Sequence, residues 1–190
     1  LGITPKDGEI YYNLANTLVK KGQSDNLSLA VKYYLKSLEI QPNNIDSANN
    51  LGLTYSYLGQ LKNAIDCFNQ SIHLNSQNPI AYYNLGLVYR KLFRLDLEVE
   101  CYKKAIAIDP NYIDANWNLA LVQLLNGVFH EGWKYYHWRY KKHADLDLRQ
   151  YSKPLWDGRS LKNKTLFIYH EHGVGDTRQC IRYVNFLSKQ

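Results

Sequence analysis

Four asparagines recur along the chain at nearly equal intervals: Asn13, Asn50, Asn84 and Asn118. The last three lie 34 residues apart, and three of the four directly follow an aromatic residue: Tyr12, Tyr83 and Trp117. A carboxamide has one acceptor and two donors, so a file of asparagines can bond both the C=O and the N–H groups of an extended peptide. Aromatic rings often contribute to protein interfaces, so we expect the three neighbouring rings to stack on side chains of the ligand. The pattern therefore predicts a row that binds peptide backbone; the alternative is that the amides bond an adjacent helix within the scaffold.

A second group of candidate binding residues lies near the C-terminus: Glu171, Gly173, Gly175, Asp176 and Thr177. It follows the β-branched and aromatic run Thr165–Tyr169 and precedes apolar residues at helical spacing in 178–187. Nucleotide-binding α/β domains begin with a strand, a glycine-containing loop and a helix in this order. The free backbone N–H groups at the start of that helix attract anions. The order predicts a phosphate or substrate loop; the alternative is a simple turn.

No metal or cofactor site is predicted. Cys67, Cys101 and Cys180 form no C-x-x-C pair, and such a pair is the usual metal knuckle. His170 and His172 point to one face of the expected strand without a further ligand. The chain has no N-terminal secretory signal and no apolar stretch near the roughly 20 residues that a membrane helix needs. We therefore expect reduced thiols, a cytoplasmic location and no membrane partner.

The basic charge of the chain is confined to one segment. Residues 133–164 carry nine Lys or Arg against three Asp, which accounts for the whole formal net charge of +6. Aromatic residues interleave with these cations, as in proteins that bind single-stranded nucleic acids. A solvated segment is the simpler interpretation, so nucleic acid is not an expected partner. Residues 147–164 are predicted to be a basic linker.

The 34-residue interval also governs the apolar residues that must position the asparagines. It relates a series of leucines and a series of aromatic residues: Leu51, Leu85 and Leu119; Tyr34, Phe68, Tyr102 and Tyr136. Apolar residues recur at i, i+3, i+4 and i+7 on both sides of Gly59, which predicts two amphipathic helices joined by a turn. Pro42 and Pro110 should end helices, because proline cannot continue one. The chain thus divides into four helix-turn-helix units: 8–44, 45–78, 79–112 and 113–146.

This pattern resembles the tetratricopeptide repeat (TPR), whose L-G…Y…G…A…Y/F…A…P signature is met by most positions of the first three units. The resemblance implies a mostly α fold: a right-handed α-solenoid of about four units over 8–146, with the first helix of each unit lining an inner groove. One unit alone cannot offset its ordering entropy, so neighbours must cover its apolar faces. Glu98 occupies a slot for a small residue, and we expect its side chain to tilt outward.

The C-terminal part carries three further motifs in order: G-x-F-x-E-G-W-x-x-Y-x-W-R, W-D-G and E-x-G-x-G-D-T. This succession resembles bacterial proteins that join TPRs to a glycosyltransferase-like domain, related to O-linked N-acetylglucosamine transferases and heptosyltransferases. The resemblance implies that 165–190 begin a truncated α/β domain whose glycine loop faces a substrate cleft. Only 26 residues follow Lys164 and methionine is absent, so we expect a fragment. Catalysis is not expected of these residues alone, and a sugar nucleotide is expected only in the full-length parent.

The asparagine file resembles the one that holds protein substrates in the superhelix of the O-linked N-acetylglucosamine transferases. Chaperone-type TPRs that clamp a C-terminal carboxylate instead need Lys and Arg in the groove. The corresponding slots of this chain are uncharged: Tyr12, Asn16, Asn50, Ile80 and Asn84. We predict a protein-interaction module that binds an extended protein or peptide segment. The alternative is the N-terminal part of a glycosyltransferase whose repeats select the acceptor protein.

Overall fold

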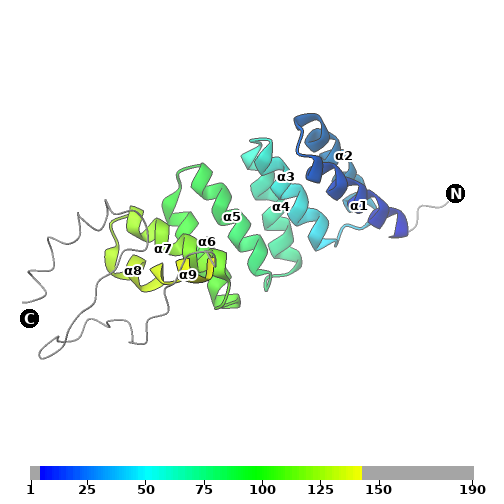
Figure 1. The fold of residues 1–190 in the computed structure, drawn as a ribbon. Helices are drawn as coiled ribbons and strands as arrows, with labels where there is room; N and C mark the ends of the chain where they lie inside the picture. Colours follow the sequence, from blue (N-terminus) through cyan, green and yellow to red (C-terminus); the bar gives the residue numbers. More distant parts are fainter. Residues whose placement is uncertain (1–4, 143–190) are drawn as a thin grey trace, which may run out of the picture. The chain divides into compact units, whose positions relative to one another are not determined.

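The computed structural model describes residues 5–142, which contain helices and turns and no β-strand. The helices in chain order are α1 (Pro5–Lys21), α2 (Ser24–Ile40), α3 (Ile45–Tyr57), α4 (Leu61–Leu74), α5 (Pro79–Lys91), α6 (Leu95–Ile108), α7 (Ile113–Leu125), α8 (Phe129–Tyr136) and α9 (Arg139–Lys142). Figure 1 shows α1 to α8 following one another in sequence order. The predicted basic linker 147–164 and the predicted strand, loop and helix of 165–190 lie outside the described residues.

The helices pack as successive pairs. Short turns join α1 to α2, α3 to α4, α5 to α6 and α7 to α8, and the two helices of each pair are in extensive contact. The second helix of each pair also packs against the first helix of the next pair, and α3 contacts both α1 and α5. Each pair thus covers an apolar face of its neighbour. This arrangement confirms the predicted mostly α fold, an α-solenoid of paired helices.

Local sequence signals set the helix ends. Asn44 Oδ1 accepts a hydrogen bond from the backbone N–H of Ser47 at the start of α3, at 2.8 Å. At the start of α5, Asn78 Oδ1 accepts one from the N–H of Ile80, at 3.1 Å. Such caps satisfy donors that have no partner within the helix. α2 and α6 both end two residues before a proline. The helix ends predicted from Pro42 and Pro110 are therefore confirmed.

In the cores of the second and third helix pairs, an aromatic ring lies over a glycine. Phe68 and Tyr102 are fully buried on α4 and α6. A Cβ atom on Gly52 would lie 2.8 Å from the Phe68 ring, and one on Gly86 would lie 2.5 Å from the Tyr102 ring. Both distances are shorter than a van der Waals contact. The glycines therefore allow the rings to touch the backbone of the preceding helix.

Glu98 does not tilt outward, so that expectation from the sequence is wrong. Its side chain is 1% exposed, and its Oε1 accepts a hydrogen bond from Arg90 Nε at 2.6 Å. Arg90 lies on α5 and reaches over the ring of Tyr102, with 5.7 Å between guanidinium carbon and ring centroid. A buried carboxylate is tolerated only when it is paired and hydrogen-bonded. Arg90 supplies this partner from the other helix of the pair.

The two cysteines of the described region are buried at equivalent places, Cys67 on α4 and Cys101 on α6. Burial raises the pKa of the Cys67 thiol from 9.0 to about 12 and that of Cys101 to about 11. Only the thiolate is nucleophilic, so both residues are expected to be chemically inert in the folded protein.

This inertness can be measured with a thiol reagent in a Cys180→Ser background. At pH 8 we expect the folded protein to react at least about 100-fold more slowly than the urea-unfolded chain, because both the thiolate fraction and access are reduced. Both pKa values are raised in the folded state, so the thiols contribute stability that is complete below pH 9 and is lost as the pH rises toward 11 or 12. Equal rates in the two states would contradict the prediction.

None of the helices in residues 5–142 is long and apolar enough to cross a lipid bilayer.

Candidate functional site

The first helices of the four pairs, α1, α3, α5 and α7, carry the predicted asparagines, and we call them the first-helix row. Side-chain hydrogen bonds link successive members of this row. Asn50 Nδ2 on α3 donates to Asn16 Oδ1 on α1 at 3.0 Å and to the Tyr12 hydroxyl at 3.3 Å. These bonds cross from one repeat to the next. Asn50 therefore holds two repeats together.

The next two asparagines serve the scaffold in the same way. Asn84 Nδ2 on α5 donates to Asn49 Oδ1 on α3 at 3.3 Å, and Asn118 Nδ2 on α7 donates to the Tyr83 hydroxyl on α5 at 3.1 Å. Both asparagines are buried. The scaffold alternative raised by the sequence thus describes what Asn84 and Asn118 do in the structure. Each amide nitrogen donates one of its two N–H groups to the scaffold.

Asn13 stands apart from the other three predicted asparagines. It lies on α1, the first helix of the row, and its side chain is exposed. No helix precedes α1 within the described residues, so no repeat on that side covers its amide. The four asparagines therefore do not share one environment: exposure falls from Asn13 through the half-buried Asn50 to the buried Asn84 and Asn118.

The three aromatic residues next to the asparagines are half-buried and pack against rings of their own scaffold. Tyr12 lies against Tyr34 with 6.2 Å between ring centroids, and Trp117 lies against Tyr136 at 5.3 Å. Tyr83 contacts the rings of Tyr102, at 5.8 Å, and Tyr112, at 5.1 Å. The prediction that these rings stack on a ligand is not tested by these contacts. The contacts do show that each ring is held in place before any ligand arrives.

Asn16 is a functional candidate that the spacing argument passed over. Its Oδ1 accepts hydrogen bonds from both Asn50 Nδ2 and the Tyr34 hydroxyl. Burial raises the pKa of Tyr34, so its hydroxyl keeps its proton and remains a donor. The signal was present in the sequence, because Asn16 and Asn50 are 34 residues apart whereas Asn13 and Asn50 are 37 apart.

Tyr12, Asn16, Tyr34 and Asn50 form a connected group that we call the Asn16 cluster. Its internal bonds use the Oδ1 of Asn16, the Nδ2 of Asn50 and the hydrogen of Tyr34. An amide has two donors and one acceptor, and a tyrosine hydroxyl is both donor and acceptor. Three groups are left without a partner among the described residues: the Asn16 amide nitrogen, the Asn50 carbonyl oxygen and the Tyr12 hydroxyl hydrogen. The two donor groups can bond a peptide C=O, and the acceptor can bond a peptide N–H.

The loop residues predicted to face phosphate or substrate, Glu171, Gly173, Gly175, Asp176 and Thr177, lie outside the described residues.

Models of tetratricopeptide repeats match most of the described part of the chain. The model described as TPR repeat matches residues 54–92 and 99–127. Two models described as tetratricopeptide repeat match residues 8–44 and 80–112 in one case and 33–66 in the other. Together these matches run from residue 8 to residue 127. No curated protein sequence matches the chain.

Solved structures with the same arrangement of helices include MamA, which superposes with a TM-score of 0.65 at 27% identity over 74% of this chain and 81% of MamA. YrrB, described as a TPR protein with an unusual peptide-binding site, gives a TM-score of 0.59 at 24% identity over 71% of this chain and 70% of its own. The first TPR of Spaghetti (RPAP3), bound to the HSP90 peptide SRMEEVD, gives a TM-score of 0.60 at 21% identity over 66% of this chain and 97% of its own.

Proposed function

Because the chain belongs to the tetratricopeptide repeat family, we propose that it is a protein-interaction module whose first-helix row binds an extended peptide segment of a protein partner. The observation that carries this proposal is the Asn16 cluster, in which internal hydrogen bonds orient three polar groups and leave them unpaired. Two similar structures, YrrB and the first TPR of Spaghetti, are described with a peptide-binding site or a bound peptide. The structural similarity of this chain to these two proteins supports a peptide as the ligand.

The ligand is recognised through its backbone. The Asn16 amide nitrogen and the Tyr12 hydroxyl donate to a peptide C=O, and the Asn50 carbonyl oxygen accepts from a peptide N–H. Asn13, exposed one turn earlier on α1, extends the polar surface along the row. The internal bonds fix these side chains before binding, so less conformational entropy is lost when the ligand arrives. Backbone contacts of this kind favour an extended segment and leave the choice of side chains to the surrounding surface.

Apolar residues on the other helices of the row provide that surface. Ile80 at the start of α5 and Leu121 on α7 are exposed on helices whose asparagines serve the scaffold. Tyr57 at the end of α3 is exposed as well. We propose that a ligand lies with its backbone on the Asn16 cluster and apolar side chains further along the row. Tyr83 and Trp117 act there as rigid ring surfaces.

The proposal is tested by the affinity of the Asn50→Ala variant for the strongest binder from a library of extended, C-terminally amidated peptides. We expect the dissociation constant to rise about tenfold, the effect of losing one net hydrogen bond of about 1.4 kcal/mol. Asn84→Ala is the matched control, because it removes a side-chain bond of the same kind between repeats, to Asn49. This control should lower the melting temperature without changing the affinity. Equal effects of both variants on affinity would show that the asparagines act through the scaffold alone.

A charged-tail peptide provides a second control. In the slots where chaperone-type repeats carry cations, Tyr12 and Ile80 flank the asparagines. A carboxylate buried there would lack a counter-charge. We expect the peptide SRMEEVD, which is bound by the first TPR of Spaghetti, to bind at least about tenfold more weakly than the selected amidated peptide. Tighter binding of SRMEEVD would refute backbone recognition without charge.

A second proposal concerns the alternative in which these repeats select acceptor proteins for a glycosyltransferase. It rests on the order of motifs in residues 127–177, which resembles that of proteins with such a domain. The test is sugar transfer by the full-length protein to a partner that the repeats bind, compared with transfer by a variant carrying Asn50→Ala. Loss of transfer to the bound partner, with unchanged hydrolysis of the sugar nucleotide, would support acceptor selection.

A further inference from the structure

The turn between α5 and α6 differs from the other three turns within helix pairs. Each of the other turns places a glycine in the left-handed region: Gly22, Gly59 and Gly127, with φ of 69°, 75° and 74°. The residue at this place between α5 and α6 is Phe93, with φ of 55°. A bulky side chain is rare in this region, because its Cβ crowds the following carbonyl oxygen. The signal is present in the sequence, because Gly59 and Gly127 are two 34-residue steps apart and the residue midway between them is Phe93.

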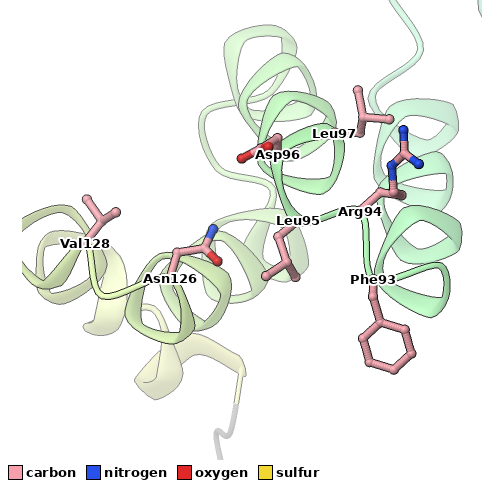
Figure 2. A pocket seen from close by; sticks show the side chains of 7 residues that line it. All are labelled: Phe93, Arg94, Leu95, Asp96, Leu97, Asn126 and Val128. Atoms are coloured by element: carbon pink, nitrogen blue, oxygen red, sulfur yellow. The ribbon is translucent and has the colours of Figure 1, made fainter.

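The described residues cover little of the Phe93 side chain. It is 86% exposed, the most exposed of the large hydrophobic residues in the described region. Figure 2 shows its ring pointing away from the other labelled side chains, whereas Leu95 points toward the α7–α8 turn. A glycine here would relieve the backbone and remove an exposed ring. A strained, exposed aromatic residue is the type of anchor that interfaces use.

A cavity of about 740 Å³ opens beside Phe93, between the α5–α6 turn and the α7–α8 turn. Leu95, Leu97 and Val128 supply apolar walls, and Asn126 lies on the far side. Further exposed apolar residues flank the cavity lining in sequence: Leu92, Leu125 and Phe129. The face formed by 92–97 and 125–129, which we call the turn face, therefore carries both a projecting ring and a hollow with apolar and polar walls.

The charges of the turn face are self-complementary. Arg94 and Asp96 both line the cavity and are exposed. Neither side chain forms an ion pair or hydrogen bond with any residue of the described region. One positive and one negative group on the same face attract no ligand of uniform charge. They do match a second copy of the face turned by a two-fold rotation, which sets each arginine opposite the aspartate of the other copy.

We propose that the turn face is the interface of a homodimer. Phe93 of each copy enters the cavity of the other, against Leu95 and Val128, and Arg94 of each copy pairs with Asp96 of the other. A stable dimer buries about 1,200–2,000 Å² in total, more than two aromatic side chains provide at about 150–250 Å² each. The flanking residues Leu92, Leu125 and Phe129 supply additional apolar area. This interface uses none of the residues of the Asn16 cluster, so a dimer presents two peptide-binding rows.

Charge reversal tests the pairing by sedimentation of the full chain over a range of concentrations. Arg94→Asp alone and Asp96→Arg alone place like charges opposite each other, so each should weaken self-association at least about tenfold. The double variant restores opposite charges and should dimerise within about threefold of the natural chain. An equimolar mixture of the two single variants should form a heterodimer, because every facing pair is again of opposite charge. A chain that stays monomeric into the millimolar range, or single variants that dimerise normally, would overturn the proposal.

The Phe93→Gly variant distinguishes an effect on dimerisation from an effect on folding. Glycine suits the left-handed turn, so the monomer, measured at a concentration below the dissociation constant, should melt at a higher temperature. The same variant should dimerise at least about tenfold more weakly, since the anchoring ring is gone. These two effects have opposite directions and cannot both come from misfolding. A lower melting temperature or unchanged dimerisation would each contradict the proposal.

Discussion

Replacement of Arg90 by methionine is expected to destabilise the protein by about 3–5 kcal/mol, because it leaves a buried charge without its partner. Glu98 is 1% exposed, and its Oε1 accepts a hydrogen bond from Arg90 Nε at 2.6 Å. Methionine keeps much of the apolar contact that the arginine stem makes and removes the guanidinium. Urea denaturation followed by circular dichroism measures the change in the free energy of unfolding.

Glu98→Ala is the informative counterpart of this variant. The side chain of Arg90 is 39% exposed, so its charge can turn toward water when the carboxylate is removed. Alanine also stands at the equivalent place of the two preceding repeats, as the fully buried Ala30 and Ala64. We therefore expect a smaller loss, about 1–2 kcal/mol.

The double variant Arg90→Met with Glu98→Ala completes a double-mutant cycle with the two single variants. It removes both charges together and should lie within about 1 kcal/mol of the natural chain. Strictly additive losses in the double variant would show that the two side chains do not depend on each other.

Gly86→Ala should lower the free energy of unfolding by about 1–3 kcal/mol, the usual effect of overpacking a well-packed core. The added Cβ would lie 2.5 Å from the ring of Tyr102. This ring is fully buried and is held between α5 and the guanidinium of Arg90, so it has little room to move. The higher helix propensity of alanine offsets at most about 1 kcal/mol of this loss of stability. Thermal and urea denaturation of the variant measure the balance.

Two other glycines separate crowding from backbone effects. Gly52→Ala meets Phe68 at 2.8 Å and should destabilise less than Gly86→Ala. Gly59 has φ of 75° and open space around it. Gly59→Ala should therefore show only the backbone penalty of about 1–2 kcal/mol. If all three substitutions had equal effects, contact with the aromatic rings would not be the reason for the glycines at Gly52 and Gly86.

The helices themselves could be predicted from the sequence because their signals are local. Periodic apolar residues define an amphipathic helix wherever it is placed, and a proline limits a helix through its own ring and missing N–H. The helix pairs around Gly59 and the helix ends before Pro42 and Pro110 follow from such signals. The sequence also predicted that the four asparagines lie on the first helices of the pairs, because a fixed interval places equivalent residues on equivalent helices.

The partners of individual polar groups could not be predicted in the same way. Glu98 violates the repeat signature, and only the approach of Arg90 from α5 explains its burial. Asn50 and Asn84 look equivalent in the sequence, yet one bonds Asn16 and the other Asn49. A hydrogen bond depends on distances of a few tenths of an ångström, which the packing of two helices sets and a repeat interval does not.

The sequence by itself determined that this chain folds into paired helices in a regular series, because propensity, apolar periodicity and turn residues act within each 34-residue unit. Only the tertiary structure decided which amides join repeats and which turn holds a strained and exposed ring. These properties arise between units: burial and hydrogen bonding depend on what the neighbouring helix brings within reach, and the same residue type meets a different neighbour in each repeat.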